Sequence, residues 1–240
     1  MKEAAFREIL REGLAPWGLA LTEDQEGLLI AYVEELILAN QRMNLTAITD
    51  PEEVAVKHIL DSLAAALAVE LAEGMTLLDV GSGGGLPGIP LKIFQPGLIL
   101  TLMEASRKKA EFLEAVCTRL FPEGWQVVWS RAEDAGRGPL RESFDLVTAR
   151  AVAPLPVLAE FCLPLVRVGG RFLALKGPDG ERELEDGARA IEVLGGRPEK
   201  TIRVVLPRDA GERLLIAIEK TGITPAKYPR RAGIPEKRPL

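Results

Sequence analysis

LLDVGSGGGLPG, residues 77–88, is the stretch that decides the fold of this chain of 240 residues. An apolar run leads to Asp79, glycines follow at positions 81, 83, 84, 85 and 88, and an apolar segment compatible with a helix comes next. This order predicts a buried strand that turns sharply into a helix. The turn carries so few side chains that a ligand can lie directly against its backbone.

Short apolar runs alternate with helical segments from residue 75 onward. Strands are expected at 75–80, 98–103, 126–130, 144–148 and 170–175, and helices at about 87–95, 106–120, 154–166 and 180–194. Such alternation predicts βαβ units and a parallel sheet. Two later runs, 201–206 and 214–220, have no helix between them and predict an antiparallel hairpin. We therefore expect an α/β fold whose seven-stranded, mostly parallel sheet ends in that hairpin.

Charge divides the chain into a helical N-terminal extension (1–73), a Rossmann-like domain (74–221) and a basic C-terminal tail (222–240). The extension holds 5 basic and 14 acidic side chains, the domain 20 of each, and the tail 5 basic and 1 acidic. A capping box at Thr22 and the cap at Asp50 predict two helices in the extension, ending near Arg42 and Leu71. Although the net charge is −5, the basic tail can still contact phosphates.

Cysteine usage and hydropathy indicate the compartment. Cys117 and Cys162 are too few for a disulfide framework, so we expect a reducing cytoplasm. No apolar run approaches the ~18 residues of a membrane span, and the amphipathic N-terminus lacks a signal-peptide core. We expect neither a membrane partner nor a metal.

The carboxylate of Asp79 helps to distinguish between two kinds of cofactor that a glycine-rich loop can bind. Pyrophosphate-binding loops avoid a carboxylate two residues before the first glycine, whereas a loop that binds the cationic amine of S-adenosylmethionine can use one. Glu104 ends the second expected strand, where a carboxylate can hydrogen-bond both ribose hydroxyls. Ala132 and Glu133, in the loop after the third strand, could read the adenine edge; the alternative is a solvated polar loop. We therefore expect a class I S-adenosylmethionine-dependent methyltransferase, with a nicotinamide dehydrogenase as the alternative.

The segment after the fourth strand, which contains Arg150, lies where such enzymes place residues that face the methyl group. It lacks the D/N-P-P-aromatic motif that holds an exocyclic nitrogen, and both cysteines fall inside expected helices, where core packing is their usual role. Guanine N7 fits this site, because its methylation needs alignment and exclusion of water rather than a base. Arg150 could orient guanine or cofactor, or form a structural ion pair. His58, three residues before Asp61 on a helix, is assigned no catalytic step.

The tail combines aromatic and basic side chains with prolines that stiffen the chain. Arginine and tyrosine can stack on unpaired bases while lysines contact phosphates. The alternative is a solvated tail without a partner. The expected RNA contacts are Lys227, Tyr228, Arg230, Arg231, Lys237 and Arg238.

Several motifs together resemble the bacterial small-subunit ribosomal RNA guanine-N7 methyltransferases, also called the glucose-inhibited division protein B family. They are Asn44-Leu45-Thr46, His58-Ile59-Leu60-Asp61-Ser62-Leu63, Asp79-Val80-Gly81-Ser82-Gly83, Leu86-Pro87-Gly88-Ile89-Pro90, Arg150-Ala151, Leu175-Lys176-Gly177 and Lys227-Tyr228-Pro229-Arg230. The resemblance spans about residues 36–240. It implies methylation of N7 of one guanosine in 16S rRNA, with the small ribosomal subunit or its assembly intermediate as partner.

The resemblance also implies site residues. It implies cofactor contacts from Gly81, Gly83, Leu86, Glu104, Ala132, Glu133 and Arg150. With Asp79, Ala105 and Ser106, these are the ten residues that we expect to contact the cofactor. Candidates for positioning the acceptor are His58, Asp61, Arg150 and Lys176. Two alternatives stay open: a small-molecule methyltransferase, which would have a closed apolar acceptor pocket, and a non-catalytic RNA-binding or ribosome assembly factor that retains the fold.

Overall fold

A computed structural model of the chain describes residues 3–240, in which seven strands form one sheet in the order β3-β2-β1-β4-β5-β7-β6. The strands from β3 to β5 pair in parallel, whereas β7 pairs antiparallel with both β5 and β6. The expected sheet with its C-terminal hairpin is therefore confirmed. The strands are β1 (Thr76–Val80), β2 (Ile99–Glu104), β3 (Trp125–Trp129), β4 (Phe144–Arg150), β5 (Val166–Lys176), β6 (Gly196–Val205) and β7 (Glu212–Lys220).

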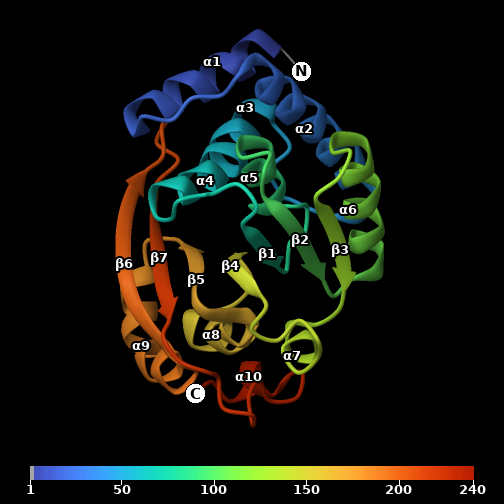
Figure 1. The fold of residues 1–240 in the computed structure, drawn as a ribbon. Helices are drawn as coiled ribbons and strands as arrows, with labels where there is room; N and C mark the ends of the chain where they lie inside the picture. Colours follow the sequence, from blue (N-terminus) through green and yellow to red (C-terminus); the bar gives the residue numbers. More distant parts are fainter. Residues whose placement is uncertain (1–2) are drawn as a thin grey trace.

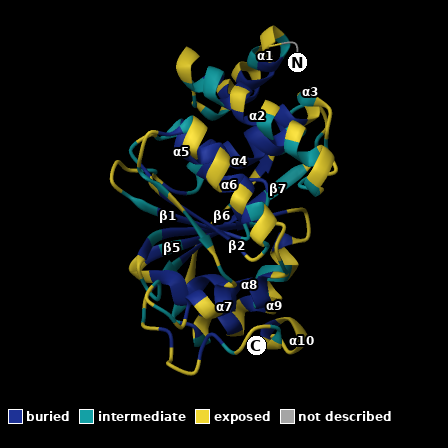
Figure 2. Cartoon of the chain, turned by 90° about the vertical axis from the view of Figure 1, so that its right-hand side faces the viewer, coloured by how far each residue is buried: buried dark blue, intermediate teal, exposed yellow. Residues whose placement is uncertain are grey.

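Helices cover both faces of this sheet, whose strands lie as a buried layer between them (Figure 2). One face carries α5 (Gly88–Phe94) and α6 (Arg107–Leu120), and the other carries α7 (Ala132–Ala135), α8 (Leu155–Cys162) and α9 (Gly180–Val193). The N-terminal helix α2 (Glu23–Met43) packs on α5 and α6, and α1 (Glu3–Leu14) lies at the top of Figure 1, against residues 51–60. Because apolar side chains point from both faces of the parallel strands, two hydrophobic cores form.

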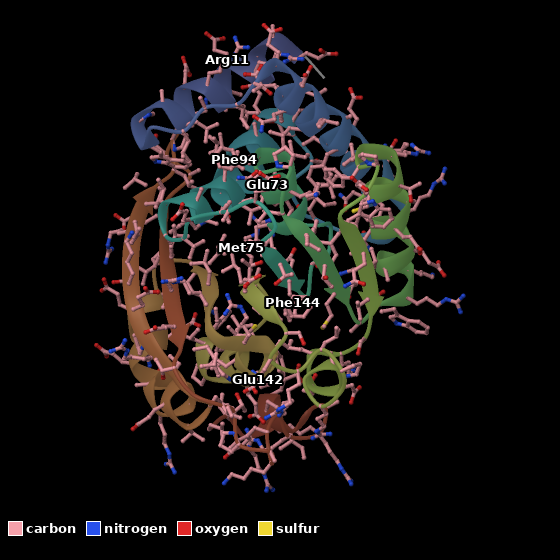
Figure 3. The ribbon with its side chains drawn as sticks, in the orientation of Figure 1. Arg11, Glu73, Met75, Phe94, Glu142 and Phe144 are labelled. Atoms are coloured by element: carbon pink, nitrogen blue, oxygen red, sulfur yellow. The ribbon has the colours of Figure 1, made fainter. Side chains whose placement is uncertain are left out.

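The acidic N-terminal extension packs onto the domain through its own ion pairs and apolar face. Thr22 and Gln25 form the expected capping box at the start of α2. Glu26, fully buried in α2, binds Arg7 and Arg11 of α1, with 2.6 Å between Arg11 Nε and Glu26 Oε1 (Arg11 is labelled in Figure 3). The acidic charge of the extension is thus partly neutralised inside it.

Two helices end earlier than the sequence predicts. The helix expected to reach residue 166 ends at Cys162, because a 3-10 turn (Leu163–Leu165) with Pro164 leads directly into β5. The helix expected to reach Leu71 ends at Leu67. It is divided into α3 (Pro51–Val54), a π-helical segment (Ala55–Leu60), α4 (Asp61–Leu63) and a 3-10 turn (Ala64–Leu67). Such π segments are frequent at functional sites, and this one carries His58.

A last short helix, α10 (Ile234–Lys237), lies in the C-terminal tail beneath α8 (Figure 1). Within residues 3–240, no helix combines the length and the apolarity that crossing a membrane requires.

Candidate active site

The glycine-rich loop after β1 is held by a side chain of β1 itself. Gly88 donates its N–H to Asp79 Oδ2 at 3.0 Å, and a Cβ at Gly88 would lie only 3.0 Å from that same oxygen. Gly81 has φ +69°, and a Cβ there would lie 2.7 Å from Val152. Glycine is required at both positions, because the backbone must approach other atoms closely or adopt a left-handed conformation.

Asp79 is fully buried, and its second oxygen has no partner. Among the residues that the structure describes, no donor hydrogen-bonds to Oδ1. Burial raises the pKa of Asp79 to about 7, and the Gly88 N–H and the positive charge of Arg150 oppose this rise only in part. A buried carboxylate with a free acceptor atom suits a cationic ligand group, which would both neutralise it and supply the missing donor.

Glu104, at the end of β2, fixes the loop from the other side. Its Oε2 accepts the N–H of Gly83 at 3.0 Å, and its Oε1 accepts the N–H of Ser106 at 2.8 Å. A carboxylate has about four acceptor positions, so both oxygens can still accept hydroxyl hydrogens. Gly83, Glu104 and Ser106 were all expected to contact the cofactor. In the structure, these two hydrogen bonds join them.

A first cavity of about 250 Å³ lies at the carboxyl ends of β1, β2 and β3. It contains five of the ten expected cofactor residues and three carboxylates, of Glu104, Glu133 and Glu236, against one guanidinium, of Arg131. Its excess of negative charge suits a positively charged ligand. Its lining is Val80, Gly81, Met103, Glu104, Ala105, Ser130, Arg131, Ala132, Glu133, Ala151, Val152, Phe161 and Glu236.

A second cavity, of about 390 Å³, adjoins the first at Ala151, which lines both. Ala151 has φ +56°, a strained conformation for alanine that is typical of functional sites. The lining is charged rather than apolar, which disfavours the closed apolar pocket of a small-molecule methyltransferase. It consists of Lys57, His58, Asp61, Arg150, Ala151, Leu175, Lys176, Gly177, Glu183 and Arg213.

Asp61 organises the second cavity by binding two arginines from different strands. Arg150 Nη1, on β4, lies 2.9 Å from Asp61 Oδ2, and Arg213 Nε, on β7, lies 3.1 Å from Oδ1. The Arg213 contact is an ion pair without hydrogen-bond alignment, since Oδ1 has no hydrogen bond in the described chain. Lys176 pairs with Glu183 at 2.6 Å and donates to the Ala153 carbonyl at 2.7 Å. All four expected acceptor-side residues therefore line one cavity.

His58 lines this cavity with both ring nitrogens engaged. Its Nδ1 lies 3.0 Å from the Lys57 carbonyl, which can only accept, so Nδ1 carries the proton. Its Nε2 therefore accepts the Thr46 hydroxyl at 2.7 Å. Burial and the positive charge of Arg150 lower the pKa of His58 to about 4, so the ring is neutral at pH 7. His58 is thus held in place from both sides of its ring, and the expectation that it takes no catalytic step stays a prediction.

The tail is packed rather than solvated, and its expected RNA contacts separate into two groups. Tyr228 is buried in the core beside α8, and Arg230 pairs with the fully buried Glu160 at 2.6 Å. The side chains of Lys227, Arg231, Lys237 and Arg238 are exposed. RNA binding by these six residues stays a prediction.

Both cysteines are buried and unpaired. Burial raises the pKa of Cys117 to about 12 and that of Cys162 well above its ordinary value, so neither is a thiolate nucleophile. Residues 3–240 hold no group of three or more His, Cys, Asp or Glu side chains arranged to bind a metal ion.

Among the lining residues that were not predicted as site residues, four carry charged side chains outside the loop 130–134. Lys57, Glu183 and Arg213 line the second cavity, and Glu236 of the tail lines the first. Lys57 directly precedes His58 in the quoted motif and could have been found from its position. The other three come from segments whose local sequence has no signature, so only the tertiary fold brings them to the site.

Comparison with known families and relatives gives one consistent result. Residues 25–210 match the family model described as GidB, rRNA small subunit methyltransferase G. The Ribosomal RNA small subunit methyltransferase G of Pelotomaculum thermopropionicum is 50% identical over 238 residues, which cover 99% of this chain and 100% of that protein. The protein of the same name from Symbiobacterium thermophilum is 47% identical over 246 residues and the whole of both chains.

Two solved structures with a similar fold are methyltransferases by name. Precorrin-6y C5,15-methyltransferase from Geobacter metallireducens superposes with a TM-score of 0.52 at 13% identity, over 67% of this chain and 87% of that one. A predicted O-methyltransferase from Agrobacterium tumefaciens gives 0.53 at 18% identity, over 68% and 81%. At these identities the likeness shows the class I methyltransferase fold alone.

Proposed function

Because the chain belongs to the rRNA small subunit methyltransferase G family, we propose that it transfers a methyl group from S-adenosylmethionine to N7 of one guanosine in 16S rRNA. The observation that carries this proposal is the pair of adjoining cavities that share Ala151. One has the carboxylates and open backbone that suit the cofactor, and the other has the basic lining that suits a nucleotide. A methyl group held at their junction would face an acceptor in the second cavity.

The residues present fit the cofactor. Asp79 Oδ1, buried and without a hydrogen bond in the described chain, would accept the cationic methionine amine. Glu104 would accept the ribose hydroxyls, and Ala132 and Glu133 would meet the adenine edge. When bound, S-adenosylmethionine supplies a methyl group on a cationic sulfur, which the in-plane lone pair of guanine N7 can accept without proton transfer.

The chain's own residues then have to orient the guanine and exclude water, rather than move a proton. Arg150 is the best placed to do so, because it lies beside Ala151 and is held by Asp61 at 2.9 Å. Its guanidinium can donate to guanine O6, which leaves N7 free toward the methyl group. Lys176, Lys57 and Arg213, each paired with a carboxylate, would also donate to flanking phosphates.

The partner we propose is the small ribosomal subunit or an assembly intermediate of it, met in the cytoplasm. The buried, unpaired cysteines agree with a reducing compartment. The exposed basic side chains of the tail, Lys227, Arg231, Lys237 and Arg238, would contact phosphates outside the cavity.

Methyl transfer from labelled S-adenosylmethionine to unmodified small-subunit rRNA, and to intact subunits, tests this function. Chemical cleavage at N7-methylguanosine should then map the label to one guanosine. Label at another atom or base would refute the N7 assignment. Cofactor binding without RNA labelling would favour a small-molecule acceptor, and the absence of both would favour a non-catalytic assembly factor.

A further inference from the structure

The tail is anchored to the domain by two arginines of the segment before β4. Arg141 donates to the carbonyls of Thr224 and Tyr228, at 2.5 and 2.7 Å, and Arg137 donates to the carbonyl of Pro229 at 2.8 Å. Glu142, labelled in Figure 3, accepts the Thr224 N–H at 2.8 Å. These contacts hold the backbone of the tail rather than its basic side chains.

A buried ion pair fixes the next part of the tail to α8. Glu160 is fully buried, and Arg230 surrounds its carboxylate with its backbone N–H at 2.6 Å, Nε at 3.0 and 3.1 Å, and Nη2 at 2.6 Å. A bidentate arginine–carboxylate pair has a fixed geometry. The direction in which the chain leaves Arg230 is therefore set by α8.

From Arg230 the tail reaches the first cavity. Gly233 donates its N–H to Glu133 Oε1 at 3.0 Å, and Glu236 of α10 is one of the residues that line the cavity. The tail, which is expected to bind RNA, thus also contacts Glu133, which is expected to contact the adenine edge.

We propose that the tail segment 230–237 forms one wall of the S-adenosylmethionine site, and that Glu236 there favours the positively charged cofactor over the product S-adenosylhomocysteine, whose net charge is zero. This inference rests on the proposed cofactor site. The sulfonium gives the cofactor one more positive charge than the product, and three glutamates in the cavity outnumber its one arginine. Glu236 is exposed on its outer side, so its field is partly screened and its effect is modest.

Two matched substitutions in the full-length protein test the role of Glu236. Glu236→Gln removes the carboxylate that lines the cavity, and Lys237→Gln removes an exposed charge from the next residue of the same helix. Affinities for S-adenosylmethionine and S-adenosylhomocysteine are measured by titration calorimetry without RNA. We expect Glu236→Gln to weaken cofactor binding about threefold and product binding much less, and Lys237→Gln to leave the ratio of the two affinities unchanged.

A third substitution tests whether the tail segment 230–237 contributes to the binding of the two ligands. Arg230→Lys keeps a positive charge beside the buried Glu160 but loses the two-pronged geometry. We expect it to weaken the binding of both ligands by about threefold or more while thermal melting still shows a folded protein. The proposal is overturned if the folded Arg230→Lys protein binds both ligands as the unmodified protein does, or if Glu236→Gln leaves the affinity ratio unchanged. Failure of the unmodified protein to bind S-adenosylmethionine would instead refute the proposed function.

Discussion

Arg150 on β4 and Asp61 on α4 form a largely buried ion pair, with 2.9 Å between Arg150 Nη1 and Asp61 Oδ2. Their side chains are 13% and 6% exposed, so the pair is shielded from solvent and from salt. It joins the N-terminal extension to the carboxyl end of the sheet at the wall of the second cavity. The extension therefore contributes directly to the proposed acceptor site rather than only covering the sheet.

Replacement of Asp61 by Asn should separate catalysis from cofactor binding. Two arginines lose their shared counter-charge, so Arg150 is no longer held toward the acceptor, while the first cavity is unchanged. We expect methyl transfer to fall at least about tenfold, cofactor affinity to change less than about threefold, and the free energy of unfolding to fall by about 3 kcal/mol.

Asp145→Asn is the matched control for this substitution. Asp145 also pairs with an arginine, Arg167 at 2.5 Å, but at the start of β4 and away from both proposed cavities. It should lose stability and keep its activity in the folded state. Equal losses of methyl transfer in the two variants would contradict a specific role for Asp61.

Cofactor affinity should rise with pH around neutrality. Burial raises the pKa of Asp79 to about 7, and its charged neighbours, Arg150 and Glu104, act on it in opposite directions. The protonated form predominates at pH 6 and the ionised form at pH 7.5, and only the ionised form attracts the cationic amine. Titration should therefore show S-adenosylmethionine binding about eightfold tighter at pH 7.5 than at pH 6. Asp79→Asn should bind weakly at both values; a variant that keeps the pH dependence would assign it to another group.

The glycine-rich loop could be predicted from the sequence because its chemistry is local. Asp79, Gly81 and Gly88 lie within ten residues, and the hydrogen bond from Gly88 to Asp79 closes inside that stretch. The alternation of strands and helices is likewise a local pattern, which is why the sheet with its hairpin was predicted correctly.

The rest of the site depends on contacts that join distant segments. Arg213 reaches Asp61 only because β7 pairs antiparallel with β5 beside β4. Arg230 resembled a free basic residue, since its partner Glu160 lies far away in α8 and is an unusual buried carboxylate. The amino-acid composition shows that the tail is basic and polar. It cannot show which of the basic side chains are already paired with a carboxylate elsewhere in the fold.

His58 should make the protein less stable in acid. In the folded state its pKa is lowered to about 4, whereas an unfolded chain protonates histidine near its ordinary value of 6.5. Between these values the unfolded state binds more protons, so this contribution to stability is present above pH 6.5 and is lost as the pH falls toward 4. The free energy of unfolding, measured with urea, should fall between pH 7 and pH 4 in both proteins. For His58→Gln this fall should be smaller than for the unmodified protein, by up to about 3 kcal/mol. Parallel pH profiles for the two proteins would contradict the assignment.

Replacement of Glu104 by Gln should weaken the cofactor site at its ribose end. The carboxylate accepts the N–H groups of Gly83 and Ser106, and an amide cannot accept at both of its ends. One backbone donor and part of the expected ribose contact are therefore lost together, at about 1–3 kcal/mol, or roughly 5- to 150-fold in S-adenosylmethionine affinity. Glu114→Gln, on the exposed face of α6, is the control and should bind normally. Unchanged affinity of a folded Glu104→Gln protein, measured by calorimetry, would place the ribose elsewhere.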